Sequence, residues 1–67
     1  MLKSLRELKL GDTLIHYETQ ENLSIAQILP KDEKEGTNYY FPLLGYVRDK
    51  CMKKMFKTGV ENKFEVI

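Results

Sequence analysis

The first hydrophobic residues recur at helical spacing behind a capping signal. Ser4 and Glu7 stand at the spacing of a capping box, in which Ser4 satisfies an early amide and Glu7 reaches back. Leu5 and Leu8 then share one helical face, and Gly11 can end the turn in a left-handed conformation. The pattern predicts a short helix over residues 4–10, which depends on packing because so short a helix has little stability alone.

Two patterns of β-strand type follow, over residues 12–18 and 22–29. The first is rich in β-branched and aromatic residues, and its alternation puts three residues on one face: Leu14, His16 and Glu18. One face of the second segment carries Leu23, Ile25 and Leu29. A polar turn separates the two segments, so an antiparallel hairpin is the simplest arrangement. Pro30 should end the pairing of the second strand.

A third strand is predicted over residues 38–47. One parity carries Tyr39, Phe41, Leu43 and Val47, and the other carries Tyr40, Leu44 and Tyr46. Pro42 indicates an edge strand because it lacks an N–H, and Gly45 indicates a bulge or bend. A bulge there would reverse the parity of the residues after it.

The C-terminal third predicts a helix over residues 50–58, with Asp49 as its N-cap and Gly59 as its C-cap. An apolar stripe is formed by Cys51, Met52, Met55 and Phe56. The opposite face carries Lys50, Lys53, Lys54 and Lys57. Residues 63–67 alternate again and predict a last short strand, with Phe64 and Val66 on one face.

The order of these segments predicts an α+β fold in one domain, residues 1–67. Such short runs cannot hold the crossovers of a parallel sheet, so we expect a small twisted antiparallel sheet with a short N-terminal helical turn and a C-terminal amphipathic helix. The segment Glu7-Leu-Lys-Leu-Gly-Asp-Thr-Leu-Ile15 resembles the start of the first strand in many small barrels. That resemblance implies an SH3-like or OB-like partial barrel, and it implies no function.

Composition indicates a soluble globular protein rather than a disordered one. The chain has 67 residues, of which 42% are hydrophobic and 31% charged, and its formal net charge is +1. The single cysteine cannot form an internal disulfide. The sequence shows no apolar stretch of the length needed for a signal peptide or a membrane span. We therefore expect a cytoplasmic protein with no membrane contact.

The residues offer little chemistry. A zinc site needs about four ligands, and the chain has one histidine and one cysteine, His16 and Cys51. The carboxylates of residues 31–35 alternate with lysines and lack calcium-loop spacing, so residues 31–38 predict a solvated loop. His16 and Cys51 are also the sole nucleophile–base pair to consider, and a place on the apolar stripe predicts that Cys51 packs in the core. We expect no enzyme activity, no metal and no cofactor.

Two surface features suggest binding instead. The first is the basic group made of Arg48, Lys50, Lys53, Lys54 and Lys57, which could meet phosphates or an acidic protein. The second is a group of tyrosines around residues 39–46. Adjacent strand residues face opposite ways, so we expect an outward tyrosine at Tyr40 or Tyr46. Outward tyrosines serve as contact residues for proteins and as stacking surfaces for single-stranded nucleic acid.

The sequence therefore predicts a non-catalytic protein-interaction module, such as a small regulator or inhibitor of a larger protein. The alternative is a small barrel that binds RNA or single-stranded DNA through the lysine helix face and the sheet tyrosines, although the near-neutral total charge disfavours it. A homodimer through an edge strand is a further option. The candidate contact residues under each reading are Tyr40, Tyr46, Arg48, Lys50, Lys53, Lys54 and Lys57.

Overall fold

Ten short elements follow one another in residues 1–29 and 36–67, the part of the chain that the computed structural model describes. The strands are β1 (Leu2–Lys3), β2 (Thr13–Ile15), β3 (Asn22–Ser24), β4 (Gln27–Leu29), β5 (Asn38–Phe41), β6 (Gly45–Arg48) and β7 (Phe64–Glu65). One α-helix, α1 (Asp49–Met55), and two 3₁₀ helices, η1 (Leu5–Glu7) and η2 (Val60–Asn62), complete the order. The predictions for Pro30 and for the carboxylates of 31–35 lie outside the described residues.

The strands form three small antiparallel sheets: β1 with β7, β2 with β3, and β4–β5–β6. Isolated bridges from Leu14 to Val66 and from His16 to Phe56 connect β2 to the C-terminal segment. The α+β class and the antiparallel pairing are thus confirmed. The SH3-like or OB-like barrel is not seen in the described residues, because the three sheets stay open and separate.

The predicted strand over 22–29 divides between two sheets, because its backbone changes partner after Ile25. The N–H of Ile25 donates to the carbonyl of Asp12 at 2.9 Å, on the β2 side, whereas the N–H of Ala26 donates to the carbonyl of Tyr40 at 2.7 Å, on the β5 side. Leu23 and Ile25 are buried as predicted. Leu29, expected beside them, lies in the other sheet and is 41% exposed.

The predicted strand over 38–47 is a hairpin, so the prediction of one edge strand is wrong, while the bulge or bend predicted at Gly45 is a turn. The N–H of Leu44 donates to the carbonyl of Phe41 at 2.9 Å, which closes a tight turn through Pro42, and Gly45 leaves that turn with a φ of +102°. The parity does not reverse after the turn, because Val47 pairs with Tyr39 on the same buried face. Leu43, predicted on that face, lies in the turn and is 85% exposed.

Helix α1 is shorter than predicted and ends at Met55, because the next residues join a strand-like bridge. The N–H of Lys57 donates to the carbonyl of Ile15 at 2.8 Å, which takes the backbone out of the helix. Asp49 is the first helical residue and not the N-cap, and Gly59 precedes η2 and does not cap α1. The predicted helix over 4–10 is likewise reduced to η1, residues 5–7.

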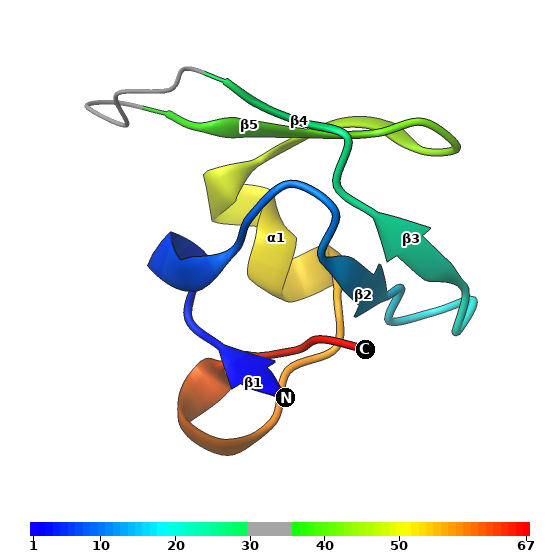
Figure 1. Cartoon of the computed structure of the whole chain (residues 1–67). Coiled ribbons are helices and arrows are strands. Elements are labelled where there is room, and N and C mark those ends of the chain that lie inside the picture. The colour runs from blue at the N-terminus through cyan, green and yellow to red at the C-terminus, as the bar shows by residue number, and fades with distance from the viewer. Residues whose placement is uncertain (30–35) are drawn as a thin grey trace.

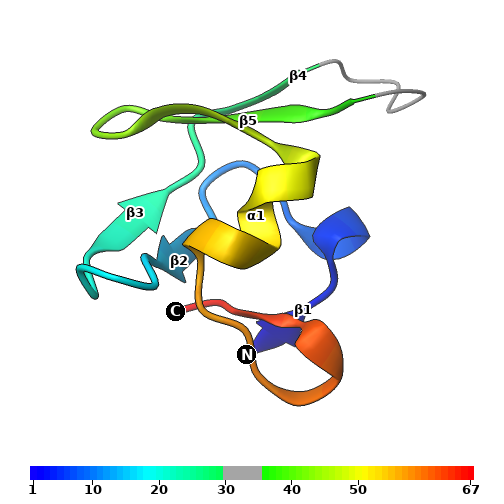
Figure 2. The ribbon, with the colours of Figure 1, turned by 180° about the vertical axis from the view of Figure 1, so that it is seen from behind.

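The three-stranded sheet forms one layer, and α1 lies beneath it in both views (Figure 1; Figure 2). The β2–β3 hairpin lies beside α1, and the two chain ends lie on the side of α1 away from that sheet (Figure 1). The core between these parts consists of Leu8, Leu14, Leu23, Ile25, Tyr39, Phe41, Val47, Met52, Phe56, Phe64 and Val66. The rings of Phe41 and Phe56 lie 4.7 Å apart, centroid to centroid, so β5 contacts the end of α1 directly.

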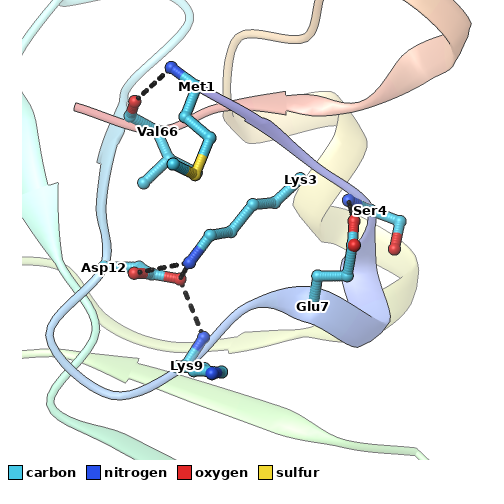
Figure 3. A network of polar contacts seen from close by, with 7 residues as sticks. All are labelled: Met1, Lys3, Ser4, Glu7, Lys9, Asp12 and Val66. Carbon is cyan, nitrogen blue, oxygen red and sulfur yellow. Dashed lines mark hydrogen bonds and ion pairs between the residues drawn. The ribbon is translucent and has the colours of Figure 1, made fainter.

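A polar network holds the N-terminal segment in place (Figure 3). The ammonium of Lys3 lies 3.0 Å from a carboxylate oxygen of Asp12, and the same oxygen accepts the N–H of Lys9 at 2.9 Å. The carboxylate of Glu7 accepts the N–H of Ser4 at 2.8 Å, as the capping-box pattern predicts, and this bond is the main cause that lowers the pKa of Glu7. Gly11 then has a φ of +89°, the left-handed conformation expected of it.

Candidate functional site

The outer face of the β4–β5–β6 sheet carries two rows of side chains. The register aligns Gln27, Tyr40 and Tyr46 in one row and Leu29, Asn38 and Arg48 in the next. Alternation along each strand turns the intervening residues, such as Tyr39 and Val47, into the core. One face of the sheet is therefore closed by the core, while the other faces away from it.

Tyr40 and Tyr46 form the centre of this outer face. They are direct cross-strand partners, and their rings lie 4.8 Å apart, centroid to centroid, with planes tilted by 49°. Tyr46 is 63% exposed, whereas Tyr40 is half-buried between its neighbours. Cross-strand aromatic pairs stabilise the sheet and fix both rings. The structure thus brings the two predicted tyrosines together as one fixed aromatic surface, which we call the tyrosine face.

Three leucines extend the exposed apolar surface near this sheet, and two of them, Leu29 and Leu43, were expected on buried faces. Leu29 is 41% exposed in the row beside the tyrosines, and Leu44 is 38% exposed in the turn before β6. Leu43 in the same turn is 85% exposed. The exposure of Leu43 was missed because 38–47 was treated as one strand, although a proline followed three residues later by a glycine is a turn signal.

Apart from Arg48, the members of the basic group lie on α1 or just after it, and not on the tyrosine face. Its members are all exposed: Arg48, Lys50, Lys53, Lys54 and Lys57. None of them forms an ion pair with another residue in the described ranges, where the ion pairs are Lys3–Asp12 and Lys63–Glu61. Helix α1 packs under the sheet through Met52, on the side opposite the outward tyrosines. Arg48, on the same strand face as Tyr46, connects the two features.

His16 and Cys51 are not arranged as a nucleophile and its base. The Nδ1 atom of His16 accepts the N–H groups of Glu18 and Thr19 at 3.2 and 3.4 Å, and its ring meets Phe56 edge-on at 5.9 Å. His16 is buried, so its contacts support the turn after β2. Cys51 is exposed, which corrects the prediction that it packs in the core, because α1 buries its Met52 and Phe56 side instead.

A hollow that sequence reasoning did not find lies beside β3. It measures about 310 Å³ and is lined by the consecutive residues 22–26 together with Phe41, Pro42 and Leu43. It includes the point at Ile25 and Ala26 where the chain leaves one sheet for another. No pattern in the sequence signals that change of partner.

Within residues 1–29 and 36–67, no three histidine, cysteine or acidic side chains gather where they could share a metal ion. No helix in the described part of the chain is long and apolar enough to cross a membrane. Comparisons with models of protein families, with curated proteins and with solved structures gave no match to this chain.

Proposed function

We propose that this chain is a non-catalytic protein-interaction module whose contact surface is the tyrosine face. The observation that carries the proposal is the pair of touching rings of Tyr40 and Tyr46 on the outer face of the sheet, with Tyr46 63% exposed. Tyrosine is enriched among the few interface residues that dominate binding energy. A side chain already fixed by its neighbour loses little conformational entropy when a partner covers it.

The surroundings of the pair suit a protein partner. Gln27 lies next to Tyr40 across the sheet and can donate and accept hydrogen bonds. Leu29 adds apolar area, and Arg48 adds a charge whose planar donors suit a carboxylate. An apolar centre with a polar rim is the usual arrangement of a protein–protein interface. A small regulator or inhibitor of a larger protein is the role that such a face supports.

A cytoplasmic setting is part of the proposal. Cys51 is the single thiol of the chain and is exposed, so it has no internal partner. An oxidising compartment would favour pairing between molecules, whereas reducing surroundings keep the thiol free.

The test compares two tyrosines of equal exposure. Affinity capture from cells with the wild-type chain, the Tyr46→Ala variant and the Tyr17→Ala variant is read by mass spectrometry. Tyr17 is 64% exposed and lies in the turn after β2, so it is a matched control. We expect a specific partner that Tyr46→Ala loses by roughly tenfold or more and Tyr17→Ala retains, since a hot-spot tyrosine is worth about 2 kcal/mol. Equal retention by both variants would refute the tyrosine face.

A second candidate function is binding of RNA or single-stranded DNA, and the basic group is the observation in its favour. Five exposed cations without a recorded ion pair in the described residues could lie along phosphates. The sheet separates most of them from the stacking surface of the tyrosines, which makes this function the weaker candidate. A fluorescent oligonucleotide of about 20 nucleotides decides it: binding should fall steeply with salt and weaken in Lys53→Glu. Absence of binding at low salt rejects it.

A further inference from the structure

Strand β3 has one unpaired edge. It pairs with β2 on one side, and no strand in the described residues pairs with the other side. An unpaired edge presents N–H and C=O groups that can bind another extended chain. The direction of these groups on β3 follows from the bonds of its partner β2.

The backbone groups of Asn22 and Ser24 point toward the unpaired edge. In an antiparallel pair, hydrogen-bonded residue pairs alternate with pairs whose backbone groups point outward. The register pairs Thr13 with Ser24 and Ile15 with Asn22. The carbonyls of Thr13 and Ile15 accept N–H groups from Ile67 and Lys57, on the far side of β2. Thr13 and Ile15 thus belong to outward-pointing pairs, and so do Ser24 and Asn22.

The hollow of about 310 Å³ adjoins the same strand. It touches the five consecutive residues from Asn22 to Ala26. Neighbouring strand residues face opposite ways, so a hollow that touches all five lies against the backbone of the strand and not along one row of its side chains. Its apolar lining includes Ile25 and Phe41, which are 2% and 0% exposed, and the exposed Leu43.

One end of the edge is acidic. Glu21 precedes β3 directly, and Glu18 lies in the same turn; both are exposed. Neither carboxylate forms an ion pair with a residue of the described ranges. A chain that lies along β3 would therefore gain from a cation at the end near Asn22.

We propose that β3 binds an extended peptide segment of a partner protein as an added antiparallel strand. The peptide backbone bonds to Asn22 and Ser24, an aliphatic side chain enters the hollow over Phe41, and a lysine or arginine at the peptide's C-terminal end lies near Glu21. Main-chain bonds supply affinity and the hollow supplies selectivity, as in other cases of strand addition. The site goes beyond the tyrosine face, and neither depends on the other.

The test uses a capped hexapeptide of alternating valine and threonine that ends in lysine. Amide hydrogen exchange of the whole chain is followed by NMR with and without saturating peptide. We expect exchange at Asn22 and Ser24 to slow by about tenfold. Exchange at Ile25 should change little, because its N–H is already bonded to Asp12. Protection elsewhere, without protection of Asn22 and Ser24, overturns the proposal.

Two controls separate strand addition from simple apolar contact. Methylation of the peptide amides that face β3 should weaken binding by roughly tenfold, since it removes donors and keeps the side chains. Ser24→Pro removes the outward N–H of β3 and should weaken binding similarly, whereas Ser24→Ala keeps that N–H and should not. Equal binding of the methylated peptide overturns the proposal even if Ser24→Pro fails to fold. A loss of peptide binding in Tyr46→Ala would place the peptide on the tyrosine face and also overturn it.

Discussion

Replacement of Phe56 by leucine should expose how strongly the layers of this small fold depend on one ring. Phe56 is 1% exposed and lies just after α1. Its ring lies 4.7 Å from that of Phe41 in β5 and 5.9 Å, edge-on, from that of His16. One side chain thus connects the helix to both the upper sheet and the β2 hairpin. Leucine keeps a buried apolar side chain at this point and removes both ring contacts.

The size of the effect follows from a comparison with Phe64. Phe64 is 0% exposed, and no ring contact is recorded for it in the described residues. Both Phe→Leu changes lose similar buried area, but Phe56→Leu also loses two aromatic contacts, each worth about 0.5–1.5 kcal/mol. We therefore expect Phe56→Leu to lower the free energy of unfolding by about 1–3 kcal/mol more than Phe64→Leu does. A domain of this size has a total of only roughly 3–5 kcal/mol.

Urea denaturation followed by far-UV circular dichroism measures this difference. With a slope of about 1 kcal/mol per molar urea for a small domain, the two midpoints should differ by about 1 M or more. Equal free energies of unfolding for Phe56→Leu and Phe64→Leu would show that the ring contacts add nothing to burial. The account of Phe56 as the link between layers would then be wrong.

Three further predictions use the same denaturation assay. Burial alone would raise the pKa of Asp12, but the N–H of Lys9 and the ammonium of Lys3 outweigh it and hold the pKa below its usual value. The charged Asp12 therefore stabilises the folded state above the ordinary carboxyl pKa, and this stabilisation is lost as pH falls through the lowered pKa. The advantage in free energy of unfolding of wild type over Asp12→Asn should thus shrink below roughly pH 4. An unchanged advantage in acid would contradict it. Gly45→Ala should lower the free energy of unfolding by about 1–2 kcal/mol through backbone strain at a φ of +102°. Nothing lies within 4 Å of the added carbon, so a steric clash adds nothing to this cost. Leu43→Ala in the same turn should cost far less. Cys51→Ser should change stability by no more than about 0.5 kcal/mol, because the thiol is exposed, and a large loss would show that it packs inside.

Side-chain alternation predicted most of the core correctly. Leu14, Phe41 and Phe64 are fully buried where a period of two placed them, and Met52 is buried where helical spacing placed it. These positions could be predicted because each element is amphipathic over its own few residues. The same alternation turned Tyr40 and Tyr46 to the outer face, so the centre of the candidate site was also predictable.

The arrangement of the sheets could not be predicted, because it depends on contacts between distant residues. The backbone of Ile25 bonds to Asp12 in one sheet, and that of the next residue, Ala26, bonds to Tyr40 in another. No local sequence pattern connects these distant partners. The turn after Pro42 was not predicted, because turns usually carry polar residues and the two leucines that follow Pro42 are typical of a strand. The unpaired edge of β3 follows from the change of partner after Ile25, so the proposed peptide site was visible only in the structure.

The pairing of β1 with β7 constrains the order in which this protein can fold during synthesis. Leu2 pairs with Glu65, so β1 stays without this partner until the chain has been synthesised as far as β7. The β4–β5–β6 hairpins involve near neighbours and can form while translation continues, whereas closing so long a loop carries a larger entropic cost. The core residues beneath the sheet stay partly uncovered until then. A nascent chain that stalls before β7 is made should therefore be a better chaperone substrate than a chain that contains β7.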